Sequence, residues 1–352
     1  NKEVQQFVTN VVRDVVSRYD IDAVHLDDYF YPYRIAGKEF PDSASFTKYG
    51  NGLNKDDWRR SNVDSIIVKL STAIKEENRF CKFGVSPFGV WRNIDKDPEG
   101  SNTRAGQTNY DDLYADILLW LKNKWIDYVA PQLYWEFSFR NAPFGTLTEW
   151  WASHSYGRHL YIGHGIYRAL EGQSVAWRNP NELPNQIKKI REYPEINGSI
   201  YYSSKWFVRN PNGWNDTLQN NYYRYPAIVP PMPWIDSVKA PAPKYFSIVG
   251  GTVVQQGIEM DIAFDSVNYK YTKLYAIYIS PSTEGKFQLV ALVPSAKILQ
   301  FLIPKRLIPF YNLLRSDPNL ENPWGFYMGV TAISRTNNES EMLIKHVTGP
   351  VQ

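Results

Sequence analysis

Residues 21–31, IDAVHLDDYFY, form a short apolar run that ends in two carboxylates and several aromatic side chains. A buried parallel strand has this pattern where it leaves its sheet, because both of its faces are covered along its length. Residues 2–19 precede it and carry apolar side chains at intervals of three and four, which predicts an amphipathic helix. The sequence therefore predicts a helix followed by a parallel strand with polar groups at its carboxyl end.

The same alternation of helix and strand is repeated along the chain. The predicted pairs are helix 61–78 with strand 83–91, helix 110–124 with strand 127–135, helix 146–154 with strand 159–167, and helix 182–192 with strand 197–204, before a last helix near 214–223. Strands that alternate with helices indicate a parallel sheet, either open and doubly wound or closed into a (β/α)₈ barrel.

Polar side chains at the ends of successive strands favour the barrel. A doubly wound sheet gathers its site at one switch point, and the chain has no glycine-rich nucleotide-binding pattern. An eight-stranded barrel takes about 250 residues, but only five predicted strands precede residue 225. We therefore expect a (β/α)₈ TIM-type barrel that lacks its first three strands in this chain, and a complete five-stranded open sheet is the alternative. The polar strand-end residues are Asp27, Asp28, Arg92, Gln132, Glu136, His164 and Lys205.

A proline-dense stretch, YPAIVPPMPWIDSVKAPAPK (225–244), separates this region from a different kind of sequence. It predicts a semi-rigid linker, so we expect the barrel domain to cover residues 1–233. Beyond it, short runs rich in β-branched and aromatic residues predict an all-β sandwich over residues 234–352. The segment GFYMGVTAISRTNNESE (325–341) resembles the last hairpin of a fibronectin type III domain.

The composition narrows the classes of function. The chain has 39 basic and 36 acidic side chains and no dense basic run, so nucleic acid is not an expected partner. The single cysteine, Cys81, cannot form an internal disulfide, and the five histidines form no cluster with metal-ligand spacing, so we expect no metal and no cofactor. The 12 Trp and 25 Tyr offer flat faces that suit sugar rings, although packing in a large core is an alternative use for them.

Glycoside hydrolysis needs one protonated carboxyl group and one ionised one. Strand alternation directs one of the two adjacent aspartates toward the barrel axis, and we expect Asp27 there, with His25 one layer deeper and holding it. Asp28 is expected to support Asp27 or to bind a sugar hydroxyl. Glu136 follows two aromatic residues whose apolar wall would raise its pKa, so it is the expected acid. The alternatives are a loop-capping aspartate pair, a solvated loop position for Glu136, and an acid carried by the absent strands.

Aromatic and polar side chains at the same strand ends are the expected sugar contacts. Trp91, Arg92 and Asn93 offer a stacking face, a cation and an amide, and Arg92 could equally orient the aspartates by ion pairing. Gln132, His164 and Tyr202 could equally be core polar groups. The predicted substrate-binding residues are His25, Tyr29, Tyr31, Trp91, Arg92, Asn93, Gln132, Tyr134, Trp135, His164 and Tyr202.

The segments HLDDYFYPY (25–33), SPFGVWRN (86–93) and PQLYW (131–135) occur in the order and at the spacing of the bacterial glycosyl-hydrolase-like 10 family, which the chain closely resembles over residues 1–225. The resemblance implies a TIM-type barrel, followed in many members by a fibronectin-like module, and it matches Asp27 and Asp28 to the family's paired aspartates. It also implies an exported protein of the periplasm or cell surface, often a lipoprotein whose amino-terminal signal has been removed and which is attached to the membrane. The activity it implies is hydrolysis of peptidoglycan glycan strands stripped of their peptides.

The sequence therefore predicts a metal-independent glycoside hydrolase that acts on a glycan of the bacterial cell envelope or on another polysaccharide. The alternative is a glycan-binding protein without catalysis on the same barrel. Such a protein would keep the aromatic residues Tyr31, Trp91 and Trp135 but would have no acid within reach of Asp27.

Overall fold

The computed structural model describes residues 1–264, 266–268, 270–308 and 325–348. The chain forms two compact units, Asn1–Thr217 and Leu218–Gln352, and each has its own hydrophobic core. None of the helices in the described part of the chain combines the length and the apolar character needed to cross a membrane.

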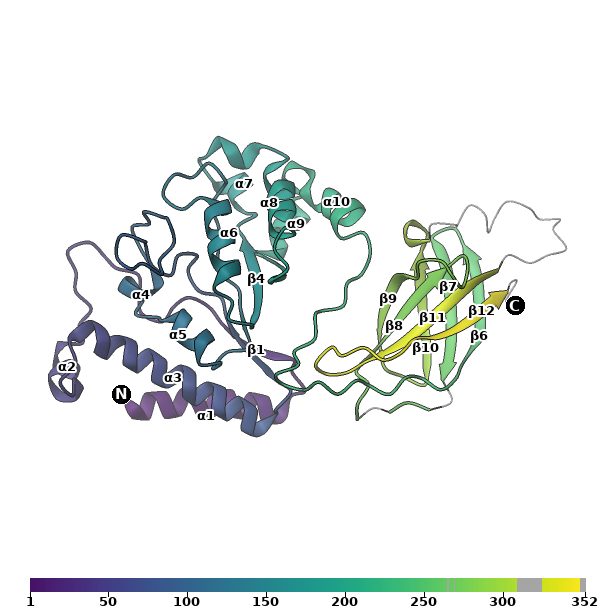
Figure 1. Ribbon diagram of the computed structural model, residues 1–352, viewed down its shortest axis with the longest axis horizontal. Helices are drawn as coiled ribbons and strands as arrows, with labels where there is room; N and C mark the ends of the chain where they lie inside the picture. Colours follow the sequence, from purple (N-terminus) through teal and green to yellow (C-terminus); the bar gives the residue numbers. More distant parts are fainter. Residues whose placement is uncertain (265, 269, 309–324, 349–352) are drawn as a thin grey trace. The chain divides into compact units, whose positions relative to one another are not determined.

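The first unit is built on a parallel sheet of five strands whose order in space follows their order in the chain (Figure 1). The strands are β1 (Ala23–Leu26), β2 (Lys82–Val85), β3 (Tyr128–Val129), β4 (His159–His164) and β5 (Ile196–Tyr201). Each is shorter than the predicted segment, but isolated bridges from Gln132 to Phe88 and to Gly163 continue the parallel pairing beyond the strand ends. The predicted parallel α/β sheet is confirmed, whereas the described strands do not make a complete eight-stranded barrel.

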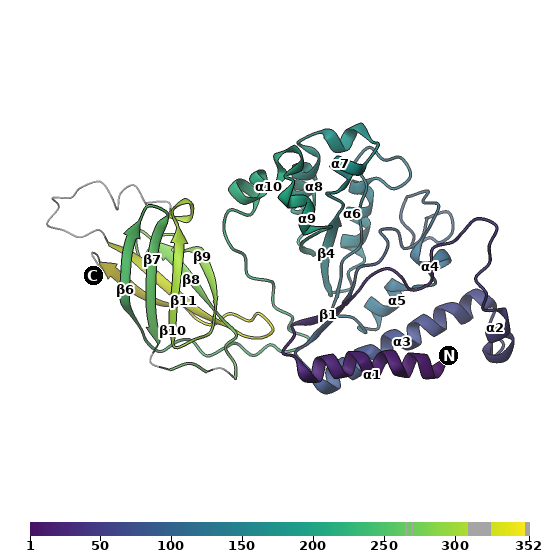
Figure 2. The same cartoon turned by 180° about the vertical axis from the view of Figure 1, so that it is seen from behind.

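Four long helices lie close to their predicted positions, and α1 and α3 lie side by side (Figures 1 and 2). They are α1 (Lys2–Arg18), α3 (Lys55–Glu77), α6 (Phe144–Ser153) and α8 (Glu182–Ile190). The start of α3 was predicted too late, because Asn54 caps the helix by accepting a hydrogen bond from the backbone N–H of Asp57 at 2.9 Å. The predicted helix 110–124 is broken, because Tyr114 adopts φ 53° in the middle of it.

Several short elements escaped the prediction because they are too short to leave a periodic pattern. The broken helix forms α4 (Asn109–Asp112) and α5 (Ile117–Lys122), and the last predicted helix forms α10 (Trp214–Thr217) and a π-helical turn, η3 (Leu218–Tyr222). The elements that were not predicted are α2 (Ser43–Tyr49), α7 (Arg168–Glu171), η1 (Val175–Arg178), α9 (Ser204–Val208) and η2 (Pro211–Gly213).

Large and small residues alternate across one face of the parallel sheet. The His25 ring stacks on Tyr128 with centroids 5.7 Å apart, and its Nδ1 lies 3.0 Å from the Tyr128 hydroxyl. Tyr128 in turn meets the edge of Tyr161 at 5.8 Å. A Cβ at Gly84 would lie 2.3 Å from the Tyr128 ring, so only glycine leaves room for this packing. His25 therefore bonds to Tyr128, and not to Asp27 as predicted.

Most tryptophans serve the core rather than a sugar-binding surface. Trp120 and Trp151 are fully buried, and the Trp151 Nε1 donates to the carbonyl of Gly89 at 2.8 Å. Core packing therefore accounts for much of the aromatic richness. The eight tryptophans that are buried among the described residues are Trp58, Trp91, Trp120, Trp150, Trp151, Trp177, Trp206 and Trp214.

The second unit consists, over its described residues, of two antiparallel sheets that share one apolar core. The predicted all-β character is confirmed, while the likeness to fibronectin stays a prediction, and Trp324 of the last predicted strand lies outside the described residues. One sheet has the order β10-β7-β6 and the other β12-β11-β8-β9. The strands are β6 (Phe246–Val254), β7 (Gly257–Phe264), β8 (Leu274–Ser280), β9 (Gln288–Pro294), β10 (Ile298–Pro304), β11 (Gly325–Ile333) and β12 (Leu343–Thr348), with a short helical turn η4 (Lys305–Leu307) after β10.

The proline-dense stretch is part of the second unit, although the sequence predicted a semi-rigid linker between two domains. Met232 and Ala240 are buried. The Asn338 Nδ2 and the Thr336 hydroxyl both donate to the carbonyl of Asp236, at 2.8 and 3.1 Å. Polar side chains of the loop after β11 thus supply hydrogen bonds to this backbone segment. The segment cannot pair in a sheet because its prolines lack the N–H group. The two units divide at residues 217/218, compared with the predicted boundary after residue 233.

Candidate active site

Asp27 lies where three strands of the parallel sheet end together. Its Oδ1 accepts a hydrogen bond from Gln132 Nε2 at 2.8 Å and another from the backbone N–H of Asp28 at 2.8 Å. The same Gln132 nitrogen donates to the carbonyl of Ser86 at 2.9 Å, so residues that follow β1, β2 and β3 are joined. Asp27 is exposed to solvent while its carboxylate is held in one orientation. Gln132, one of the predicted substrate contacts, instead positions this carboxylate.

Asp28 has the opposite environment, with only 2% of its surface exposed. Burial raises the pKa of Asp28, the hydrogen bond donated by the Tyr33 hydroxyl opposes this rise, and the negative charge of Asp27 adds to it. Burial and the bond to Asp28 also raise the pKa of Tyr33, which therefore keeps its proton. The two adjacent aspartates thus differ in burial, and the raised pKa of Asp28 is a property that a general acid needs.

Three tyrosines form an aromatic wall beside Asp27. Tyr134 stacks on Tyr202 with centroids 6.0 Å apart, and Tyr167 meets both rings edge-on at 6.0 and 5.9 Å. Burial raises the pKa of Tyr134, and the charge of Asp27 adds to this rise, so the Tyr134 hydroxyl remains a donor within the field of that carboxylate. A Cβ at Gly165 would lie 2.9 Å from the Tyr134 Cβ, so glycine permits this approach. Tyr134 and Tyr202 were predicted, whereas Tyr167 was missed although it ends a predicted strand.

Trp91 and Asn93 do not form the predicted sugar platform. Trp91 is 4% exposed, donates from Nε1 to Asp116 at 3.2 Å and stacks on Trp150 at 6.0 Å. Both ends of the Asn93 amide bond to the backbone of Ala105 at 2.9 Å, which closes the loop after β2. These side chains stabilise the fold, and their polar atoms are already satisfied.

Arg92 also stabilises the fold. It forms ion pairs with Asp97 at 3.0 Å and with Asp111 at 2.9 Å. The structure gives it no ion pair with Asp27 or Asp28, because the carboxylates of its own loop and of α4 balance its charge first. The predicted ion pair of Arg92 with the aspartates is therefore corrected, while its contact with a sugar stays a prediction.

His164 is a core group, and the prediction that it contacts substrate is wrong. It is fully buried, its Nδ1 lies 2.9 Å from Gln186 Oε1, and its Nε2 lies 3.1 Å from the Ser199 hydroxyl. Burial lowers the pKa of His164 to about 4, so the ring is neutral near pH 7.

Glu136 is 7% exposed, and its charge acts on Glu182 of α8. In the residues that the structure describes, no hydrogen bond or ion pair joins Glu136 to Asp27 or Asp28. The structure thus brings together the aspartate pair, and the role of Glu136 stays a prediction.

The remaining predicted aromatic residues differ in exposure and in contacts. Tyr29 is 74% exposed and stacks on Tyr33 at 5.8 Å. Tyr31 is half-buried in the loop that follows. Trp135 is also half-buried, against the edge of Phe88 at 5.3 Å. Tyr33 was not selected from the sequence, although it lies in the same aromatic segment as the aspartates.

Among the described residues, no group of three or more histidine, cysteine or acidic side chains is placed to hold a metal ion. The chemistry that these groups can perform without one is proton transfer and stabilisation of a positive charge by carboxylate. Those are the requirements of glycosidic bond cleavage.

Comparison with known proteins agrees with this chemistry. The family model described as glycosyl hydrolase-like 10 matches residues 1–177. Glycosyl hydrolase YngK of Bacillus subtilis (strain 168) is 42% identical over 345 residues, which cover 96% of this chain and 64% of YngK. Glycosyl hydrolase DigH of Escherichia coli (strain K12) is 41% identical over 208 residues, which cover 57% of this chain and 47% of DigH. The chain thus spans about half to two thirds of these relatives.

Similarity to solved structures is weak. The crystal structure of a Bacteroides uniformis β-glucuronidase matches with a TM-score of 0.30 and 11% identity, and the match covers 86% of this chain and 32% of that one. This likeness is too low to inform the fold or the site.

Proposed function

The chain belongs to the glycosyl hydrolase-like 10 family, and from this we propose that it is a glycoside hydrolase acting on a glycan of the bacterial cell envelope. The observation that carries the proposal is the aspartate pair at the end of β1, in which Asp27 is exposed and oriented while burial raises the pKa of Asp28. Peptidoglycan strands stripped of their peptides are the first substrate to test.

Asp27 is the carboxylate that meets the sugar. Its negative charge stabilises the oxocarbenium-like centre that forms as the glycosidic bond breaks. The donors on its Oδ1, from Gln132 and from the Asp28 backbone, hold it in place before the substrate arrives.

Asp28 supplies the proton, and Tyr33 carries it to the glycan. Asp28 is 2% exposed whereas Tyr33 is 42% exposed, and the two are hydrogen-bonded. When Asp28 is protonated, its carboxyl O–H becomes the donor of this hydrogen bond and the Tyr33 oxygen becomes the acceptor. As Asp28 gives its proton to the Tyr33 oxygen, Tyr33 gives its own to the leaving oxygen, which departs with the electron pair of the broken bond. Water then adds to the sugar and returns a proton to Asp28, so the cycle is balanced.

We also propose that the five strands belong to a (β/α)₈ barrel. The strand order that follows the chain supports this, as do the large and small side chains that interdigitate beneath the site.

Hydrolysis is tested directly by incubating the protein with denuded peptidoglycan strands, chitin oligosaccharides and neutral polysaccharides, and reading the products by mass spectrometry. We expect new reducing ends, with one water added for each bond cleaved. A folded protein that releases no product from any of these glycans would show that it binds glycan without cleaving it, or does neither.

Tyr33→Phe is expected to remove the route for the proton. Activity on glycans with poor leaving groups should fall by on the order of 10²–10⁴, while activated aryl glycosides, which need no protonation, should be cleaved almost as before. Rates on both substrate types give the measurement. Glu136→Gln is the matched comparison, and if that variant alone shows the dependence on leaving group, the acid is Glu136 and the proposed relay is wrong.

A further inference from the structure

The loop that follows the aspartate pair encloses a pocket of its own. The pocket has a volume of about 870 Å³ and is lined by residues 31–41, by two side chains of α3, by Asp112 at the end of α4 and by Tyr114 between α4 and α5. Its lining includes neither aspartate of the pair, but it includes Tyr33, which donates to Asp28. The pocket therefore adjoins the site through one shared side chain.

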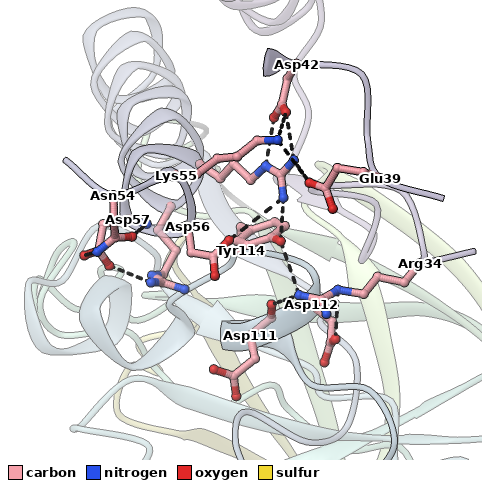
Figure 3. Close-up of polar contacts among 12 residues, drawn as sticks. Arg34, Glu39, Asp42, Asn54, Lys55, Asp56, Asp57, Asp111, Asp112 and Tyr114 are labelled. Atoms are coloured by element: carbon pink, nitrogen blue, oxygen red, sulfur yellow. Dashed lines mark hydrogen bonds and ion pairs between the residues drawn. The ribbon is translucent and has the colours of Figure 1, made fainter. Parts of the chain in front are cut away.

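A network of ion pairs holds the walls of this pocket in place (Figure 3). Arg59 of α3 is 3% exposed and binds the two oxygens of Asp42 from Nε and Nη2, at 2.8 and 2.7 Å. Its Nη1 donates to the Tyr114 hydroxyl at 2.6 Å. Arg34 donates to the same Tyr114 hydroxyl at 3.2 Å and pairs with Asp112 at 3.1 Å. Because the walls are fixed, the pocket exists before any ligand binds.

The lining combines aromatic faces with hydroxyl-binding groups. Phe40 and Tyr33 are each 42% exposed, and Tyr31 meets the edge of Phe40 at 5.3 Å. Side chains that stack on a ring and carboxylates or ammonium groups that bind its hydroxyls are what a sugar-binding pocket requires.

The charges of the lining cancel. Its three cations are balanced by three anions, and Arg34 pairs with Asp112. Arg59 pairs with Glu39 of the lining and with Asp42 outside it, and Lys55, which pairs with the same two carboxylates, keeps the total neutral. Lys38 and Asp56 complete the balance. A carboxylated sugar would bring an unmatched charge into this pocket, which is costly where water is partly excluded, whereas an uncharged sugar would not.

We propose that this pocket is a subsite for an uncharged sugar residue of the glycan that is cleaved at the aspartate pair. The assignment rests on the proposed function for the identity of the ligand as a glycan. The sugar ring lies on Phe40, and Asp56 and Lys38 bind its hydroxyls.

The test is calorimetric titration with chitohexaose, an uncharged oligosaccharide, and with hexagalacturonate, an acidic one. All variants carry Asp27→Asn, so that the probe stays intact. Phe40→Ala and Asp56→Asn should each weaken binding of chitohexaose by roughly 5- to 10-fold, the worth of one stacking or hydroxyl contact. Tyr49→Ala is the matched control, because Tyr49 is 48% exposed on α2 and lies outside the lining, and it should bind as the parent does.

Three results would overturn the subsite. The first is unchanged binding of chitohexaose by both pocket variants when they are folded. The second is a loss of chitohexaose binding in the Tyr49→Ala control as large as that in the pocket variants. The third is a parent protein that binds hexagalacturonate more tightly than chitohexaose, or that binds neither. Asp56→Asn keeps the test decisive if Phe40→Ala does not fold. Cleavage by the wild-type protein is followed separately, so binding that depends on Phe40 without any cleavage would uphold the subsite and refute the hydrolase.

Discussion

Asp27→Asn is expected to abolish turnover, with kcat falling by on the order of 10³-fold or more, the range seen when a charge or donor that acts in the transition state is removed. The substitution keeps the volume of the side chain but removes the negative charge that must stabilise the oxocarbenium-like centre. Gln132 can still bond to the amide oxygen, so the fold and glycan binding should be retained. Release of reducing ends from denuded glycan strands gives the measurement.

The matched control for this variant is Asp95→Asn, since Asp95 is an exposed aspartate in the loop after β2. That variant should keep wild-type activity. If Asp27→Asn retains activity, or if both variants lose it equally, Asp27 has no part in the chemistry.

Arg59→Leu is expected to cost the first unit about 3 kcal/mol of unfolding free energy. Removing one partner of a buried ion pair typically costs about 3–5 kcal/mol, because the other charge is left in a poorly solvated place. The lower end applies here, because Lys55 still lies 3.2 Å from Asp42. For a unit of this size the melting temperature should fall by roughly 10 °C. Thermal and urea unfolding followed by circular dichroism give both quantities.

Two further variants show whether the buried charge is the cause. Arg59→Leu combined with Asp42→Asn should recover much of the loss, because no charge is then left unmatched. Arg13→Leu removes ion pairs of α1 with Glu76 and Glu77 in which the Arg13 side chain is 41% exposed, and should cost no more than about 1 kcal/mol. A loss in Arg13→Leu as large as that in Arg59→Leu would mean that burial of the pair does not matter.

The aspartate pair and its neighbours could be located from the sequence because parallel strands end at the same edge of a sheet. That rule brought Asp27, Gln132 and Tyr134 together, although they are far apart in the chain. It fails beyond the strand end, because a side chain there can turn either toward the open site or into the packing beneath it. Trp91 and His164 turned into the packing, and nothing in their local sequence distinguishes them from Tyr134.

Two further features could not be predicted because they depend on contacts with distant segments. They are the helix break at Tyr114 and the position of the proline-dense stretch. Tyr114 takes a left-handed backbone conformation where its hydroxyl meets Arg59, a partner 55 positions away. Met232 is buried, and its backbone N–H donates to the distant carbonyl of Thr336 at 3.2 Å. Local periodicity cannot report on contacts made by distant segments.

The loop of residues 31–42 is tied down at both ends, near its start where Tyr33 bonds to Asp28 and at its end where Asp42 bonds to Arg59. Between these ties, residues 35–38 form an exposed turn that carries little of the fold. Mutation can therefore alter this turn over generations without disturbing the aspartates. In the proposed hydrolase, such an arrangement would let the preference for one polysaccharide change while the cleavage chemistry at the aspartates is inherited unchanged.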